Sequence, residues 1–84
     1  NIDPINKLQI DLRGFRVNQA IRETEKHLDS ALVSEMKLIQ ILHGRGTGAL
    51  MAAIHDFLSE QSFVINYYLA NEDQGGAGVT IVEL

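Results

Sequence analysis

The sequence has no cysteine, a single proline and no long apolar run, and each absence excludes a class of protein. Without cysteine the chain has neither a disulfide framework nor a cysteine-based metal site, which fits a reducing compartment. No apolar run approaches the ~20 residues that a membrane-spanning helix needs. No signal peptide is recognisable, so we expect a cytoplasmic location and no membrane partner. Because the first residue is Asn1 and not Met, we expect a processed chain or a piece of a longer one.

The charge balance is acidic, with 11 Asp and Glu residues against 7 Lys and Arg residues and a net charge of −4. This balance excludes a uniformly basic nucleic-acid coat but allows a local basic site, because binding depends on where the basic residues lie. The 84 residues are 45% hydrophobic and 21% charged, as in a folded domain. We expect a lead-in segment at 1–7 and a single domain at 8–84.

Hydrophobic periodicity divides the chain into six elements. Strands are expected at 8–12, 38–42, 63–70 and 79–84, an amphipathic helix of about four turns at 17–32, and a second helix from Leu50 to about Gln61. The segment 71–78 is polar and glycine-rich and is expected to be a loop. On the second helix, Ile54 and Leu58 should face inward and His55 should face solvent.

The order β-α-β-α-β-β predicts a two-layer α/β (α+β) sandwich, with a four-stranded mixed sheet and both helices on one face. Strands separated by helices should pair in parallel through right-handed crossovers. The last two strands are joined without a helix and should run antiparallel. The carboxyl ends of the first three strands then share one edge of the sheet, where ligands of open α/β sheets usually bind.

The loop His43–Gly48 has glycine at every second position and leads from a strand into a helix. Glycine lets backbone amides approach a ligand, and a helix N-terminus favours a phosphate, onto which Arg45 could fork two hydrogen bonds. The loop is neither a Walker loop nor a dinucleotide fingerprint. The alternative is an ordinary glycine-rich turn before a helix. His43 is correspondingly either a strand-end histidine bonded to backbone or a general acid or base.

Two further segments should reach the same edge. Asp11 and Arg13 point to the same side of the first strand, either as a surface ion pair or with Arg13 on a phosphate. The glycines of 75–78 form either a hairpin turn or part of the cradle. His27 and His55 are expected to be structural or surface residues. The few clustered carboxylates predict no protein-held metal, so any Mg²⁺ or Mn²⁺ would come with the phosphates of a nucleic acid.

Three segments together resemble the Smr (small MutS-related) domain. They are Ile10-Asp11-Leu12-Arg13-Gly14, His43-Gly44-Arg45-Gly46-Thr47-Gly48-Ala49-Leu50 and Gly75-Gly76-Ala77-Gly78-Val79-Thr80-Ile81-Val82-Glu83-Leu84. The resemblance covers 8–84, and the last segment resembles the C-terminus of bacterial MutS proteins of the second type. Many members have lysine where this chain has Arg45, which keeps the charge but cannot give up a proton.

The resemblance implies a fold like the C-terminal domain of bacterial translation initiation factor three. It implies binding to branched or duplex DNA, or to structured RNA or the ribosome, with endonuclease activity in several members. The parent chain would bind ATP in an upstream part and form a homodimer, whereas the isolated domain would be a monomer. Family members act either in DNA recombination control or in RNA and ribosome quality control.

The predicted mechanism is phosphodiester cleavage at the carboxyl edge. His43 would move a proton, Arg13 and Arg45 would hold the phosphate, and Asp11 would orient Arg13 or His43. The predicted binding residues are Arg13, Arg16, Gly44, Arg45, Gly46, Thr47, Gly48, Gly75, Gly76 and Gly78. The alternatives are a non-catalytic binding module for DNA, RNA or the ribosome and, from the glycine loop alone, a nucleotide-binding domain.

Overall fold

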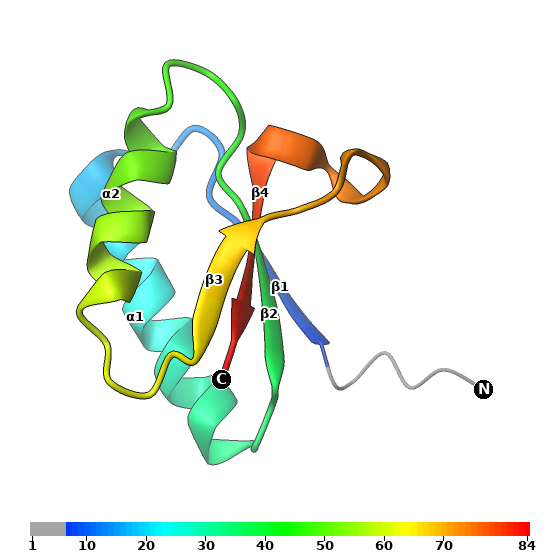
Figure 1. Ribbon diagram of the computed structural model, residues 1–84. Coiled ribbons are helices and arrows are strands. Elements are labelled where there is room, and N and C mark those ends of the chain that lie inside the picture. The colour runs from blue at the N-terminus through cyan, green and yellow to red at the C-terminus, as the bar shows by residue number, and fades with distance from the viewer. Residues whose placement is uncertain (1–6) are drawn as a thin grey trace.

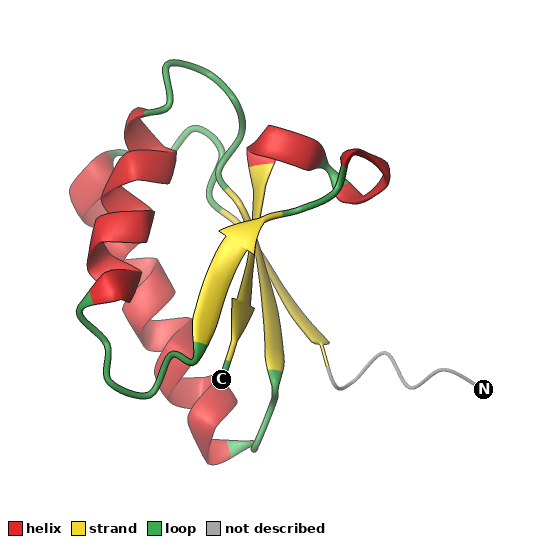
Figure 2. Ribbon diagram, viewed as in Figure 1, coloured by secondary structure: helices red, strands yellow, loops and turns green. Residues whose placement is uncertain are grey.

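The computed structural model describes residues 7–84, so the expected lead-in with Pro4 lies outside the described residues, apart from Lys7. The elements are β1 (Lys7–Asp11), α1 (Val17–Val33), β2 (Leu38–Leu42), α2 (Ala49–Ser59), β3 (Asn66–Leu69) and β4 (Val79–Glu83). The predicted β-α-β-α-β-β order and the two helices on one face of a four-stranded mixed sheet are confirmed (Figure 1, Figure 2). The expected loop at 71–78 holds two short 3₁₀ turns, η2 (Glu72–Gln74) and η3 (Gly76–Gly78).

The strand order is β1-β2-β4-β3, and this order corrects one prediction. β1 and β2 pair in parallel as expected, but β2 and β3 do not pair, because β4 lies antiparallel between them. The first four residues of β4 are buried, whereas three of the four residues of β3 are exposed. A strand that is apolar on both faces is stable only inside a sheet, so the more polar β3 takes the edge.

β3 is shorter than the predicted strand at 63–70, because a turn occupies its first part. The amide of Val64 donates a hydrogen bond to the carbonyl of Gln61 at 3.2 Å, and this bond closes a turn directly after α2. Phe63 and Val64 pack against the core from this turn. Their apolar, β-branched and aromatic character is therefore explained by core packing and not by strand pairing.

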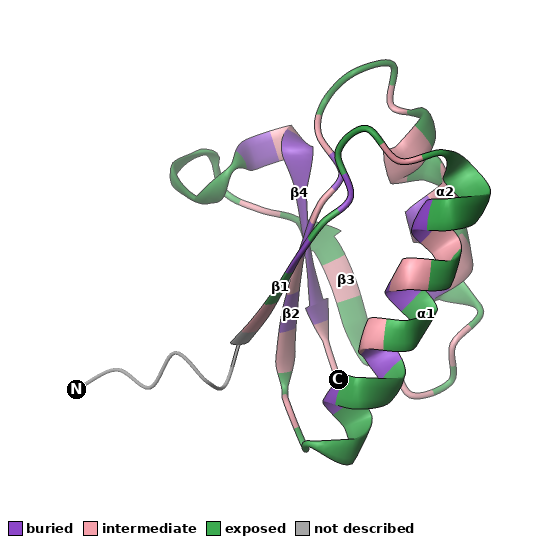
Figure 3. Ribbon diagram, turned by 180° about the vertical axis from the view of Figure 1, so that it is seen from behind, coloured by how far each residue is buried: buried purple, intermediate pink, exposed green. Residues whose placement is uncertain are grey.

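The core lies between the sheet and the helices (Figure 3). It is built from Ile10, Leu12, Ile39, Ile41 and Val82 on the sheet side and Ala20, Leu28, Ala31, Ile54 and Leu58 on the helices. α1 and α2 each bury one stripe, as the periodicity predicts. Although β3 is not paired with β2, it points in the same direction, so the carboxyl ends of β1, β2 and β3 meet at one edge (Figure 1).

Candidate functional site

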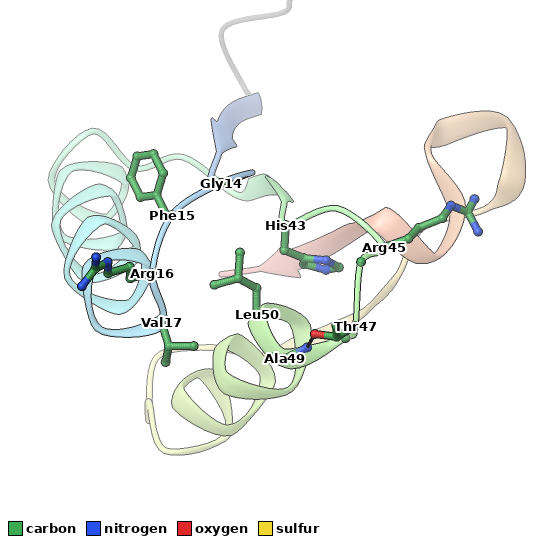
Figure 4. Close-up of a pocket in the computed structure, with 11 residues that line it drawn as sticks. Gly14, Phe15, Arg16, Val17, His43, Arg45, Thr47, Ala49 and Leu50 are labelled. Carbon is green, nitrogen blue, oxygen red and sulfur yellow. Dashed lines mark hydrogen bonds between the residues drawn. The ribbon is translucent and has the colours of Figure 1, made fainter.

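A pocket of about 510 Å³ lies at this edge, between the loop after β1 and the loop that leads from β2 into α2 (Figure 4). The first loop contributes its residues 14–17, and the second contributes His43 and residues 45–50. These two glycine-containing loops are far apart in the sequence and come together as the topology predicts. The lining also includes apolar side chains that the sequence reasoning did not assign to the site, namely Phe15, Val17, Ala49 and Leu50.

The third glycine segment supports the second loop and does not line the pocket. The carbonyl of Gly78 accepts hydrogen bonds from the amides of His43, at 3.1 Å, and Gly44, at 3.0 Å. The Gly44 amide is therefore already occupied and is not free for a ligand. This geometry favours a supporting role for 75–78 over the expected place in a phosphate cradle.

The amides that remain available belong to the end of the loop and the start of α2. Gly48 caps α2 with a φ of 85°, a left-handed conformation that favours glycine. The hydroxyl of Thr47 accepts a hydrogen bond from the Ala49 amide at 3.3 Å. The amides of Gly46 and Thr47 have no hydrogen-bond partner within residues 7–84. Unpaired amides beside a helix N-terminus carry partial positive charge and can accept an anion.

His43 is 4% exposed, and both of its ring nitrogens are hydrogen-bonded within the protein. Nδ1 donates to the Gly44 carbonyl at 2.9 Å, and Nε2 lies 2.7 Å from the hydroxyl oxygen of Thr80. Both ring nitrogens therefore have hydrogen-bond partners, as expected for a structural strand-end histidine. The ring also lines the pocket, as expected for a general acid or base. For His43 to exchange a proton with a ligand, the ring must exchange one of these partners.

His55 does not face solvent as predicted. Its Nε2 lies 2.7 Å from the same Thr80 hydroxyl oxygen, and its ring contacts the ring of Tyr67 edge-on with a centroid distance of 5.1 Å. Burial, and secondarily the neighbouring His43, hold the pKa of His55 below its ordinary value of 6.5. His55 therefore faces the sheet, where Thr80 on β4 is its polar partner.

Asp11 and Arg13 form a bidentate ion pair at the mouth of the first loop. The guanidinium donates to both carboxylate oxygens at 2.7 and 2.9 Å, and the Arg13 amide adds a third bond at 3.1 Å. These bonds lower the pKa of Asp11 to about 2. Of the two residues that Asp11 was expected to orient, it therefore orients Arg13. It does not bond to His43, whose ring nitrogens bond to Gly44 and Thr80. A Cβ on Gly44 would lie 3.3 Å from Arg13 Cγ, so the side chain of Arg13 passes close over the second loop.

Arg45 and Arg16 lie on different sides of the pocket (Figure 4). Arg45 extends away from the pocket toward η2, where its guanidinium lies 3.7 Å from a carboxylate oxygen of Glu72. Its side chain is 61% exposed, so it can turn toward a ligand at little cost. Arg16 precedes α1 and is exposed. Arg16 and Arg45 thus line a pocket that carries no acidic lining residue, whereas Arg13 is not among the residues that line it.

In the described part of the chain, no three His, Cys, Asp or Glu side chains are grouped so that they could hold a metal ion. None of the described helices has the length and apolar character needed to cross a membrane.

The fold and the site define a two-layer α/β domain with a glycine-rich, arginine-flanked pocket at the carboxyl edge of its sheet. The model of the Smr domain matches residues 10–84, and the chain belongs to this family. It is 49% identical over 77 residues to Endonuclease MutS2 of Maridesulfovibrio salexigens and 44% identical over 77 residues to Endonuclease MutS2 of Geobacillus sp.. Each match covers 92% of this chain and 10% of the relative, so the chain spans about a tenth of the length of these relatives.

Two solved structures share the fold. The crystal structure of the Smr domain of Thermus thermophilus MutS2 matches with a TM-score of 0.90 and 38% identity, covering 92% of this chain and 96% of that one. YdaL, a stand-alone small MutS-related protein from Escherichia coli, matches with a TM-score of 0.86 and 22% identity, covering 90% of this chain and 63% of that one. At this identity, the similarity to YdaL shows a shared fold only.

Proposed function

We propose that this domain binds nucleic acid at the pocket and cleaves a phosphodiester bond there. The observation that carries the proposal is the pocket itself, where His43, the unpaired amides of Gly46 and Thr47 and the arginines come together at one edge. Amides at a helix N-terminus bind one phosphate, and guanidinium groups hold the charge that develops on it. The endonuclease name of the relatives supports the same activity.

In this mechanism the side chains have separate tasks. Arg16 and Arg45 draw the backbone of the substrate to the pocket, and Arg13, whose charge is balanced by Asp11, offers its remaining guanidinium N–H groups to a phosphate. His43 gives its Nδ1 proton to the leaving oxygen, after a substrate oxygen replaces the Gly44 carbonyl at Nδ1. Mg²⁺ or Mn²⁺, where it takes part, arrives on the phosphates, and ATP binding belongs to the upstream part of the parent chain.

The substrates that fit the proposal are branched or duplex DNA and structured RNA or the ribosome, all in the cytoplasm. The parent chain would act as a homodimer and the isolated domain as a monomer. The test is incubation of the purified domain with supercoiled plasmid and with folded RNA, each with magnesium and with a chelator. Nicking or cleavage of either substrate supports the proposal.

A second candidate function is a binding module without catalysis. It is favoured by the hydrogen bonds at both ring nitrogens of His43 and by the net charge of −4, which repels nucleic acid away from the basic edge. Binding of DNA or RNA without cleavage in any divalent metal would favour this function over the first.

The contribution of Arg45 can be measured from the salt dependence of binding. Arg45→Ala should reduce the slope of log affinity against log salt by roughly one unit. Binding releases about one counterion for each phosphate contact, so the variant that lacks one contact releases one counterion fewer. Affinity should fall about uniformly across sequences. The measurement is a titration against branched DNA and structured RNA at several salt concentrations.

Arg22→Ala is the matched control, because Arg22 is exposed on α1 and does not line the pocket. Both variants change the net charge from −4 to −5. A bulk-charge effect predicts equal slopes for the two variants, and that outcome would remove Arg45 from the phosphate site.

A further inference from the structure

Thr80 has an unusual position, because its hydroxyl lies between the rings of two histidines. Its oxygen is 2.7 Å from Nε2 of His43 and 2.7 Å from Nε2 of His55, and the residue is fully buried. The two imidazoles meet edge-on with a centroid distance of 6.2 Å. A hydroxyl has one proton, so it can donate to one ring only, and the other ring must donate an N–H to it.

The direction of these bonds follows from the Gly44 carbonyl. A carbonyl can only accept, so Nδ1 of His43 carries a proton. When His43 is neutral, its Nε2 is bare and accepts the Thr80 hydroxyl, and His55 must then donate from Nε2. When His43 is also protonated at Nε2, the two bonds at Thr80 reverse, and the hydroxyl donates to a bare Nε2 on His55.

We propose that Thr80 and His55 form a proton path to His43 from the side of α2. A proton enters at Nδ1 of His55, the Nε2 proton of His55 passes to the Thr80 oxygen, and the hydroxyl proton passes to Nε2 of His43. The proton count balances, because His43 gains one proton, Thr80 keeps one and His55 changes tautomer. This inference rests on the proposed function, in which His43 delivers a proton to the substrate.

The surroundings of the three residues fit this path. His43 is almost completely buried and becomes less accessible when a substrate fills the pocket, whereas His55 is only half-buried and does not line the pocket. The groups around His55 are His43 beyond β2, Thr80 on β4 and Tyr67 on β3. The lowered pKa of His55 keeps it neutral near pH 7, so its Nε2–H is available to start the transfer. Thr80 and His55 are thus positioning residues that act through His43.

The experiment is a long-range ¹H–¹⁵N correlation spectrum of the histidine rings, recorded on the wild-type domain across a pH series. At pH 8 we expect the Nδ1–H tautomer for His43 and the Nε2–H tautomer for His55. Thr80→Val should remove the tautomer preference of His55, and Thr80→Ser should restore it. A wild-type His55 in the Nδ1–H form at pH 8, or a Thr80→Val spectrum equal to wild type, would overturn the path.

Thr24→Val is the matched control, because Thr24 is also fully buried but its hydroxyl has no hydrogen-bond partner in the described residues. Its histidine spectrum should equal that of wild type. In cleavage assays Thr80→Val should lose about tenfold or more and shift the pH profile, as removal of hydrogen-bond partners does for histidines at metal sites. The spectra do not depend on cleavage, so an inactive wild-type domain would contradict the proposed function separately from the path.

Discussion

Replacing His43 with glutamine or asparagine should lower the cleavage rate by about 10² to 10⁴ while the domain stays folded, since general acid–base catalysis contributes about this much. Asparagine can keep the hydrogen bond to the Gly44 carbonyl, and glutamine can keep the one to Thr80, but neither side chain titrates. The paired variants thus separate the loss of a proton carrier from the loss of a structural bond. The measurement is nicking of plasmid and cleavage of folded RNA, with circular dichroism to confirm the fold.

His27→Gln is the control for His43. His27 lies on α1, where its Nδ1 bonds to the carbonyl of Glu23 at 2.8 Å, and it does not line the pocket. Its substitution should leave the cleavage rate unchanged. Wild-type rates in both His43 variants would mean that the ring carries no proton in the reaction, and the binding module would then be the better description.

Gly75→Ala should destabilise the domain by about 2–4 kcal/mol, a large part of the stability of a small domain. Gly75 has a φ of 116°, and a Cβ there would lie 2.4 Å from Cγ2 of Val79, the first residue of β4. Val79 is 7% exposed and has little room to move. Urea denaturation monitored by circular dichroism measures the loss.

Gly14→Ala is the matched control for Gly75→Ala. Gly14 also has a positive φ, 86°, but no atom lies within 4 Å of the position of a Cβ. Only the backbone cost should remain there, about 1–2 kcal/mol. Equal losses for the two variants would show that the contact with Val79 relaxes freely and that only the positive φ of Gly75 favours glycine in the turn before β4.

Much of the fold follows from periodicity in the sequence. The alternation from Leu8 to Leu12, the helical spacing after Val17 and the glycines after His43 place β1, α1 and the pocket loop within one or two residues. The order of the strands in the sheet is harder to predict, because it depends on which of the last two strands, β3 or β4, is the more deeply buried. β3, with an asparagine and two tyrosines, is less apolar than β4, and this difference is the signal, because a strand buried on both faces takes an interior position.

The candidate site could be predicted only in part, because its details depend on which backbone groups are already bonded. The two loops and His43 were placed from topology alone. The capture of the Gly44 amide by the Gly78 carbonyl is a contact between distant segments and leaves no periodic trace. The contact of His55 with Thr80 spans 25 positions and depends on the rotation of α2 about its axis. One buried threonine in an apolar strand, within Val79–Glu83, is the available signal for it.

The interior place of β4 has a consequence for synthesis of the chain. Of the four strands, β4 is translated last, yet it is the neighbour of both β2 and β3. A nascent chain that ends after Leu69 therefore has one parallel pair and an edge strand with nothing to pair with. The pairing of β4 with β2 and β3 cannot form until β4 leaves the ribosomal exit tunnel, so the sheet is completed only after its last strand has been translated. Until then, the apolar stripes of both helices are accessible to chaperones and to aggregation.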